Sequence, residues 1–287
     1  MRILITGASG FIGNELVGQL GDHKLLLLSR NALSFAPNIT QIQGDLSDIE
    51  SWVDQVIDFA PEACIHLAWE GLPDYSWGQC LHNFDIGVRF YDVLARAGCR
   101  KVFVAGTCWE YGNSQGVVLE EYSPNNLTVF PSFKTSLRLI GESLSREFGF
   151  QFVWGRIFFV YGKGQRETSL IPTCMRSLSQ GEYPEIRTPE AVNDFIHISD
   201  VANAIKTLVE SPEAEGVFNI STGRPYQVSE VVKIIAQIMG KENLLVENLY
   251  EGVGKGFWGD SSRLTKITGF VPQISLKQGI ETLVHGH

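Results

Sequence analysis

Positive charge, long apolar runs and a leader segment are all scarce or missing in this sequence. Only 23 Lys and Arg stand against 32 Asp and Glu in 287 residues, which gives a net charge of −9. No broad basic face is therefore available for a phosphate backbone, and we expect no nucleic-acid partner. No run of about 18 apolar residues occurs, and the sequence opens directly on the strand-like residues 1–5 without a charged leader and cleavage site, so we expect neither membrane spanning nor secretion.

Cysteine is also scarce. The five cysteines are an odd number, and none is spaced as CxxC, so the sequence predicts neither a disulfide framework nor a metal site. A reducing cytoplasm is the expected compartment. Hydrophobic residues at 44% and charged residues at 19% are ordinary values, and they are typical of a globular protein with a sizeable core.

Short apolar runs alternate with longer amphipathic stretches through roughly the first 220 residues, which is the pattern of βαβ units. Helices are expected where apolar residues recur at three- and four-residue spacing. The predicted strands are 2–6, 24–29, 39–43, 63–67, 101–105 and 152–156, and the predicted helices include 11–20, 48–59, 79–97 and 132–148. We therefore predict an α/β protein with a doubly wound parallel sheet.

A glycine-rich turn, Thr6–Gly13, joins the first strand to the first helix with the spacing GxxGxxG. Glycines at these positions permit a tight turn, let backbone N–H groups approach a pyrophosphate, and allow the helix to pack closely on the strand. The strand–turn–helix context favours a dinucleotide site of the Rossmann type over an ordinary turn. The candidate cofactor contacts in this turn are Gly7, Ser9, Gly10, Phe11, Ile12 and Gly13.

The end of the second strand bears on which dinucleotide is bound. An Asp or Glu at this place would bind the 2′-hydroxyl of NAD, whereas an Arg would accommodate a 2′-phosphate. The residue here is Arg30, and no acid occupies positions 29–31. The sequence therefore favours NADP(H), with a solvated strand-end arginine as the alternative.

Two further strand ends carry candidate cofactor contacts. Asp45 and Leu46 follow the third strand, where they can meet the adenine, although a plain turn is the alternative. Leu67 and Ala68 close the fourth strand, and the small Ala68 suits a cofactor that runs close to the backbone.

Beyond Tyr161 the pattern changes to a loop rich in Gly, Lys and Arg, a helix near 169–180 and further short elements. We predict a Rossmann domain over 1–161 plus about 193–220, and a smaller C-terminal α/β substrate lobe over about 162–192 plus 221–287. No repeat or flexible linker separates them, so the two parts are expected to share one cleft.

Together these motifs resemble a known family, the extended short-chain dehydrogenase/reductases, in its branch of sugar-nucleotide epimerases, dehydratases and ketoreductases. The resemblance covers essentially the whole chain. It is carried by Thr6–Gly13, Gly44-Asp45-Leu46, Asn83, Gly106-Thr107 with Tyr111-Gly112, Lys134, Arg156 with Val160-Tyr161-Gly162, Asn193–Val201, Phe218–Gly223 and Asp260–Arg263. The resemblance implies a homodimer that pairs helices 79–97 and 132–148 in a four-helix bundle, with burial of their apolar faces within the monomer as the alternative.

The family's catalytic unit is a Ser or Thr, together with a Tyr and a Lys in the pattern YxxxK, which places both side chains on one helical face. The resemblance assigns Thr107 to polarise the substrate oxygen, and Lys134 both to the catalytic unit and to cofactor binding, where it would hold the nicotinamide ribose. Phe130 stands where the tyrosine is expected. A phenol would exchange the proton with the substrate oxygen, and Phe130 cannot. Position 130 therefore indicates either a natural relative that only binds or a Tyr→Phe variant that traps substrate, and we favour the variant.

Dehydratases of this family carry an Asp-Glu pair directly after the Thr, and this chain has Cys108 and Trp109 there. Dehydration is therefore disfavoured, and Arg30 favours reduction. The resemblance implies NADPH-dependent reduction of the C4 ketone of a dTDP-, CDP- or GDP-linked 4-keto-6-deoxyhexose, in bacterial deoxysugar and O-antigen synthesis. An NAD-dependent C4 epimerase and a non-catalytic NADP-binding protein are the alternatives.

The substrate contacts are expected from several segments. Trp69 opens the aromatic stretch 69–77, which follows the fourth strand and can cover a sugar, with a packed surface loop as the equal alternative. Arg187 and Lys255 offer cations for a nucleotide diphosphate, with solvated surface positions as the alternative. The predicted substrate-binding residues are Trp69, Thr107, Cys108, Trp109, Arg187 and Lys255.

Overall fold

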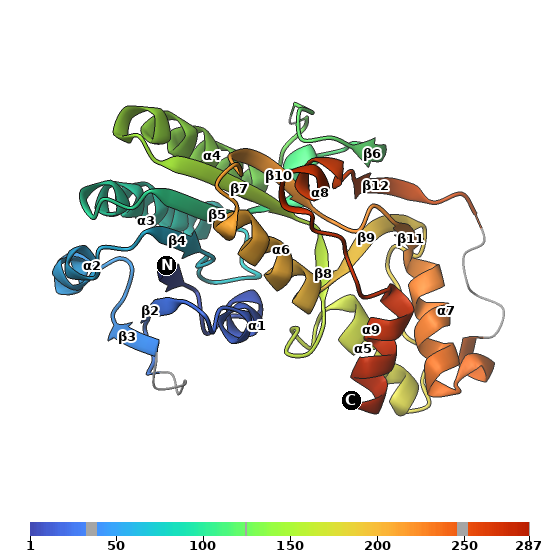
Figure 1. Ribbon diagram of the computed structural model, residues 1–287. Helices are drawn as coiled ribbons and strands as arrows, with labels where there is room; N and C mark the ends of the chain where they lie inside the picture. The colour runs from blue at the N-terminus through green and yellow to red at the C-terminus, as the bar shows by residue number, and fades with distance from the viewer. Residues whose placement is uncertain (33–38, 124, 246–251, 287) are drawn as a thin grey trace.

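A seven-stranded parallel sheet forms the centre of the larger part of the molecule (Figure 1). The computed structural model describes residues 1–32, 39–123, 125–245 and 252–286. The strands are β1 (Arg2–Thr6), β2 (Lys24–Ser29), β3 (Ile39–Gln43), β4 (Ala63–His66), β5 (Lys101–Thr107), β7 (Gln151–Ile157) and β10 (Gly216–Ile220). Their order is β10-β7-β5-β4-β1-β2-β3. The strands β1 to β3 are added toward one edge of the sheet and β4 to β10 toward the other, so the order reverses between β1 and β4. The predicted doubly wound sheet is confirmed, and ligands of such sheets bind at the carboxyl ends beside this point.

Alternating side chains of the strands build one core on each face of the sheet. Ile3 and Ile5 belong to a core shared with the helices α1 (Phe11–Gln19) and α6 (Ile198–Glu210), whereas Leu4 points to the opposite core. That second core is covered by α2 (Val53–Phe59), α3 (Trp77–Arg96) and α4 (Val129–Phe148). Figure 1 shows these two helical layers with the sheet between them.

One predicted helix is wrong in its extent. The stretch 48–59 is a 3-10 turn, η1 (Ile49–Ser51), followed by α2. Trp52 separates them because its backbone is non-helical, with φ −137°, while its indole is buried in the core and donates a hydrogen bond to the Asp45 carbonyl at 2.7 Å. Tertiary packing of one large side chain therefore overrides the helical periodicity.

A second, smaller sheet lies beside the first (Figure 1). Its strands are β6 (Gly116–Val118), β8 (Phe159–Tyr161), β9 (Ala191–His197), β11 (Pro225–Gln227) and β12 (Lys255–Gly259). The helices α5 (Leu170–Ser179), α7 (Val228–Met239) and α9 (Leu276–His285) surround a separate apolar core beside it. The short helix α8 (Ser262–Thr268) instead returns to the large sheet, where Leu264 joins the core of α1 and α6. Two more 3-10 turns, η2 (Cys108–Tyr111) and η3 (Glu242–Leu245), complete the described elements.

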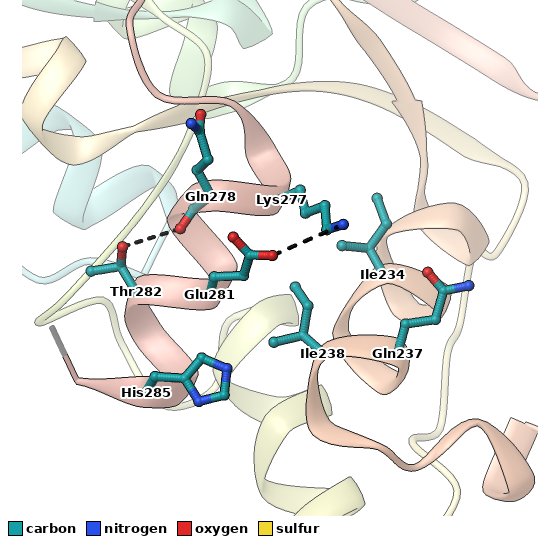
Figure 2. Close-up of a pocket in the computed structure, with 8 residues that line it drawn as sticks. All are labelled: Ile234, Gln237, Ile238, Lys277, Gln278, Glu281, Thr282 and His285. Carbon is teal, nitrogen blue, oxygen red and sulfur yellow. Dashed lines mark hydrogen bonds and ion pairs between the residues drawn. The ribbon is translucent and has the colours of Figure 1, made fainter.

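A cavity of about 610 Å³ lies between α7 and α9, and Figure 2 shows its lining. All of its lining residues come from these two helices, and Lys277 Nζ lies 4.0 Å from Glu281 Oε1 within it. None belongs to the glycine turn or to a strand end. No helix in the described part of the chain has the length and apolar character needed to cross a membrane.

Candidate active site

A second cavity, of about 570 Å³, opens at the carboxyl ends of β1, β2 and β4. Its volume lies within the ~300–1,000 Å³ that is typical of small-molecule sites. The predicted cofactor residues that line it are Gly7, Ser9, Gly10, Phe11, Ile12, Gly13, Arg30, Leu46, Leu67 and Ala68, and the predicted substrate residue Trp69 lines it as well. The structure therefore brings these residues together around one space, although their individual roles remain predictions.

The glycine turn leaves bare main chain at the floor of this cavity. Gly7 has φ +76°, and a Cβ atom there would lie 2.8 Å from the backbone nitrogen of Ala68, so the turn touches the end of β4. A Cβ on Gly13 would lie 2.1 Å from the Gly7 carbonyl oxygen. Helix α1 begins after Gly10 without a side-chain cap, so its first N–H groups are available to an anion. These features fit the pyrophosphate of a dinucleotide.

Arg30 does not stand alone at the end of β2. Its Nη1 atom lies 3.1 Å from Oε1 of Glu70, which the sequence analysis did not single out. Glu70 follows β4, and both side chains line the cavity. The strand order brings them together, and no spacing in the sequence signals this pair.

Asp45 and Leu46 separate in the structure. The Asp45 carboxylate accepts hydrogen bonds from the backbone and the hydroxyl of Ser47, at 2.8 and 2.6 Å, and these bonds lower the pKa of Asp45. This is the geometry of a plain turn, and Asp45 does not line the cavity, whereas Leu46 does.

Lys134 lies on α4 with its ammonium buried beside the cavity. Its Nζ atom donates a hydrogen bond to the Ala105 carbonyl at 2.9 Å and lies 4.0 Å from the centre of the Trp69 ring. Only 6% of the residue is exposed, and this burial lowers the pKa of Lys134 to about 7.

Burial, with the nearby Lys134 charge, also lowers the pKa of His66 to about 3. His66 Nδ1 shares a 2.7 Å hydrogen bond with the Thr6 hydroxyl, so His66 is a packed strand histidine.

Phe130 lies one helical turn before Lys134 and is enclosed by aromatic rings. It is 8% exposed, and its ring centre lies 5.0 Å from Tyr75, 5.4 Å from Trp69 and 5.9 Å from Trp109. The Lys134 Nζ atom lies 5.9 Å from the same centre. The structure therefore gathers position 130, Lys134 and two predicted substrate residues, Trp69 and Trp109, in one cluster.

Thr107 ends β5 and caps η2. Its Oγ1 accepts a hydrogen bond from the Trp109 backbone at 3.3 Å, so the hydroxyl keeps its own proton for another acceptor. The Thr107 N–H donates to Glu110 Oε1 at 3.0 Å. Glu110 is fully buried and also accepts from Trp154 Nε1 at 2.8 Å and from Arg156 Nε at 3.1 Å. A buried polar network therefore fixes the main chain that carries Thr107.

Trp69 lines the cavity, but the other five predicted substrate residues, Thr107, Cys108, Trp109, Arg187 and Lys255, do not. Cys108 is buried with Tyr111, Val118 and Phe158 in a small apolar cluster, and burial raises the pKa of its thiol. Arg187 and Lys255 are exposed on the smaller part, and neither lines the cavity. The sequence suggested these two cations for the nucleotide diphosphate of the substrate, and that role stays a prediction.

The loop after β8 contributes contacts that the sequence analysis placed in the substrate lobe or passed over. Gln165, Arg166 and Ser169 line the cavity opposite the glycine turn. Gln165 Nε2 donates to the Val160 carbonyl at 3.0 Å, while its buried Oε1 has no hydrogen-bond partner in the described part of the chain. Sequence spacing could not find them, because β8 belongs to the other sheet.

Comparison with known proteins decides the family. Residues 3–221 match the model of the NAD dependent epimerase/dehydratase family. The chain belongs to this family. The resemblance drawn from the motifs is therefore confirmed.

The relatives of this chain include both epimerases and reductases. The chain is 26% identical to an uncharacterized UDP-glucose epimerase, YtcB, of Bacillus subtilis, over 98% of this chain and 96% of that protein. It is also 26% identical to the dTDP-4-dehydro-6-deoxyglucose reductase of Escherichia coli, with the same coverage of 98% and 96%. The structure of a UDP-glucose 4-epimerase of Thermotoga maritima with UDP-glucose superposes with a TM-score of 0.86 at 23% identity, over 99% of this chain and 98% of that one.

Proposed function

We propose that this chain has the architecture of an NADPH-dependent 4-ketoreductase of a nucleotide-linked 4-keto-6-deoxyhexose, working in the cytoplasm in bacterial deoxysugar and O-antigen synthesis. The main observation behind this proposal is the place of Lys134. Its buried Nζ lies beside the cavity that the glycine turn lines, and Lys134 itself is one helical turn after Phe130. The similarity to a dTDP-4-dehydro-6-deoxyglucose reductase supports the substrate class. The nucleotide base would be identified by which of the three linked sugars is reduced, and the configuration at C4 by the product formed.

Several residues would hold the cofactor and orient the sugar. The bare main chain of the turn at Gly7 and Gly13 and the first turn of α1 would bind the pyrophosphate. When bound, the nicotinamide supplies the hydride. Lys134, whose Nζ lies beside the cavity residues Ala105 and Trp69, would hold the nicotinamide ribose. The Thr107 hydroxyl has a free proton with which to hydrogen-bond a sugar oxygen.

Phe130 leaves the proton transfer without its usual donor. Its ring presents only C–H groups to the cluster of Trp69, Tyr75 and Trp109. We therefore propose that this chain binds cofactor and substrate but turns over slowly, as expected for a Tyr→Phe variant of an active reductase.

The test is NADPH consumption by the protein and its Phe130→Tyr variant with dTDP-, CDP- and GDP-linked 4-keto-6-deoxyhexoses. A positioned general acid contributes about 10²- to 10⁴-fold, so Phe130→Tyr is expected to raise kcat by that order with one of the nucleotides. Phe133→Tyr, on the same helix but packed against Trp77 and Phe84, is the matched control and is expected to stay slow. Absence of NADPH oxidation in every form would reject the reductase.

An NAD-dependent C4 epimerase is the second candidate. The observation that favours it is the 3.1 Å ion pair between Arg30 and Glu70, which engages the arginine on which the preference for NADP(H) rests. Co-purified NAD and interconversion of C4 epimers by Phe130→Tyr without added cofactor would support it. If Phe130→Tyr catalyses neither reaction but the protein binds NADPH, the non-catalytic binding protein remains.

We also propose a homodimer through α3 and α4. The two helices pack against each other and expose apolar side chains, among them Trp77 at 65%, Leu81 and Leu139. The double variant Leu81→Glu/Leu139→Glu is expected to halve the mass seen in sedimentation equilibrium. Val271→Glu, at an exposed valine outside these helices, is the control and should leave the mass unchanged. A monomeric parent protein would reject the dimer.

A further inference from the structure

A carboxylate faces Arg30 at the end of the cavity where β2 stops. Glu70 Oε1 lies 3.1 Å from Arg30 Nη1, and the other oxygen, Oε2, lies 3.5 Å from His82 Nε2. The Glu70 side chain is 22% exposed and the Arg30 side chain 60%. Both residues line the cavity, so any group that enters this corner meets the pair and not a lone arginine.

Glu70 is held in place from α3. The buried Asn83 accepts a hydrogen bond from the Glu70 backbone N–H at 2.6 Å and donates one to the Glu70 carbonyl at 3.1 Å. Gln79 Nε2 donates to the same carbonyl at 3.2 Å. Because these contacts use only the Glu70 main chain, they place its carboxylate at the cavity and are independent of its charge.

The geometry points to Glu70 as a specificity-determining residue for the cofactor, one that weakens the preference for a 2′-phosphate which Arg30 would otherwise give. This inference rests on the dinucleotide binding proposed above. In many dinucleotide sites an acid at the end of the second strand accepts the ribose 2′-hydroxyl and disfavours a phosphate. Here the end of β2 has no acid, but β4 supplies one in space.

The electrostatic consequence is different for the two cofactors. A 2′-phosphate must compete with Glu70 for Arg30 and then remain close to a second negative charge. A 2′-hydroxyl carries no charge and can donate a hydrogen bond to the carboxylate. Glu70 therefore penalises NADP(H) and leaves NAD(H) unaffected or slightly favoured.

The test is equilibrium binding of NADH and NADPH, measured by calorimetry without any substrate or turnover. Removal of one like charge beside a partly exposed phosphate is expected to tighten NADPH binding about tenfold in Glu70→Gln at low salt. NADH binding is expected to stay within about twofold or to weaken, and the gain for NADPH is expected to shrink as salt screens it. Glu70→Asp, which keeps the charge, should not show the gain.

Glu62→Gln is the matched control. Glu62 forms the same kind of pair, with its Oε1 2.7 Å from Arg100 Nη2. It lies just before β4, at the amino end of that strand, whereas Glu70 follows the carboxyl end. The control is expected to leave the ratio of the two dissociation constants unchanged. An unchanged ratio in Glu70→Gln, or equal shifts for both cofactors, overturns the role of Glu70 while the proposed function stands. A parent protein that binds neither cofactor overturns both.

Discussion

The cavity floor near β1 and the cluster around Phe130 are built from different parts of the chain. The floor is main chain: Gly7 and Gly13 approach their neighbours so closely that no side chain fits. The cluster is made of side chains, in which Phe130 meets three aromatic rings and Lys134 covers Trp69. A site built from main chain is disrupted when a mutation adds side-chain atoms. A site built from side chains loses its reactivity when a mutation removes one functional group. Under the function proposed above, Phe130 is such a loss, and it leaves the floor intact.

The largest effect is expected at the side-chain end, where Glu110 supports Thr107. Glu110→Ala would leave the buried Arg156 guanidinium without its carboxylate, at present 3.1 Å away. Breaking a buried pair in this way costs about 3–5 kcal/mol, measured as the free energy of unfolding in urea. Asp85→Ala removes the partner of Arg89 in a pair on α3 whose side chains are 65% and 46% exposed, and it is expected to cost about 1 kcal/mol or less. Equal losses in the two variants would contradict the importance of the buried network.

At the main-chain end, Gly13→Val is expected to weaken dinucleotide binding by about 100-fold or more, because the turn must move away from the pyrophosphate. The new Cβ would meet the Gly7 carbonyl oxygen at 2.1 Å. Gly18→Ala on the same helix, where no atom lies within 4 Å of the added Cβ, is the control and should bind normally. Calorimetric titration with both dinucleotides checks this, and normal binding by Gly13→Val would reject the main-chain cradle.

An effect of intermediate size is expected from the ionisation of Lys134. Burial lowers the pKa of Lys134 from 10.5 to about 7. Between these two pH values the unfolded chain therefore binds a proton that the folded chain lacks, and the lysine's contribution to stability rises with pH. Relative to Lys134→Met, the stability of the parent protein is expected to rise by about 2 kcal/mol from pH 7 to about pH 9. Parallel unfolding curves for the two proteins across this range would show that the ammonium is not desolvated.

The smallest effect is expected at Ser9. This residue lines the cavity but adds only a hydroxyl to a turn whose shape is set by its backbone. Ser9→Ala is expected to change the dissociation constant of either dinucleotide by less than about threefold, the scale of one exposed hydrogen bond. A loss as large as that of Gly13→Val would remove the contrast between the two ends of the site.

The strands were predictable because their signal is local. Residues 2–6, 24–29 and 39–43 have the predicted bounds in the structure. The first two strands are continuous apolar runs, as buried parallel strands are, whereas 39–43 is an edge strand in which apolar and polar residues are mixed. The stretch 48–59 was predicted as one helix, and only the burial of the Trp52 indole explains the interruption. The spacing of apolar residues indicates which face of a helix is buried. It does not indicate that the Trp52 side chain is buried from a non-helical backbone conformation.

The candidate site was predictable where it is contiguous. The residues of the glycine turn all line the cavity because one short segment carries them. Glu70 and the residues at 165–169 were missed or placed elsewhere, since they reach the cavity from β4 and from the second sheet. Arg187 and Lys255, expected at the diphosphate of the substrate, are exposed and do not line this cavity, so their role stays a prediction.

The sequence by itself determined the parallel sheet, the glycine turn after its first strand and the phenylalanine one helical turn before Lys134, because each depends on residue types at short, fixed spacings. Tertiary structure alone decided that Glu70 pairs with Arg30 and that the Lys134 ammonium is buried against Trp69. These pairings depend on which strands become neighbours and on which helix covers their ends. They set the charge at both ends of the site through contacts between residues that are far apart in the chain.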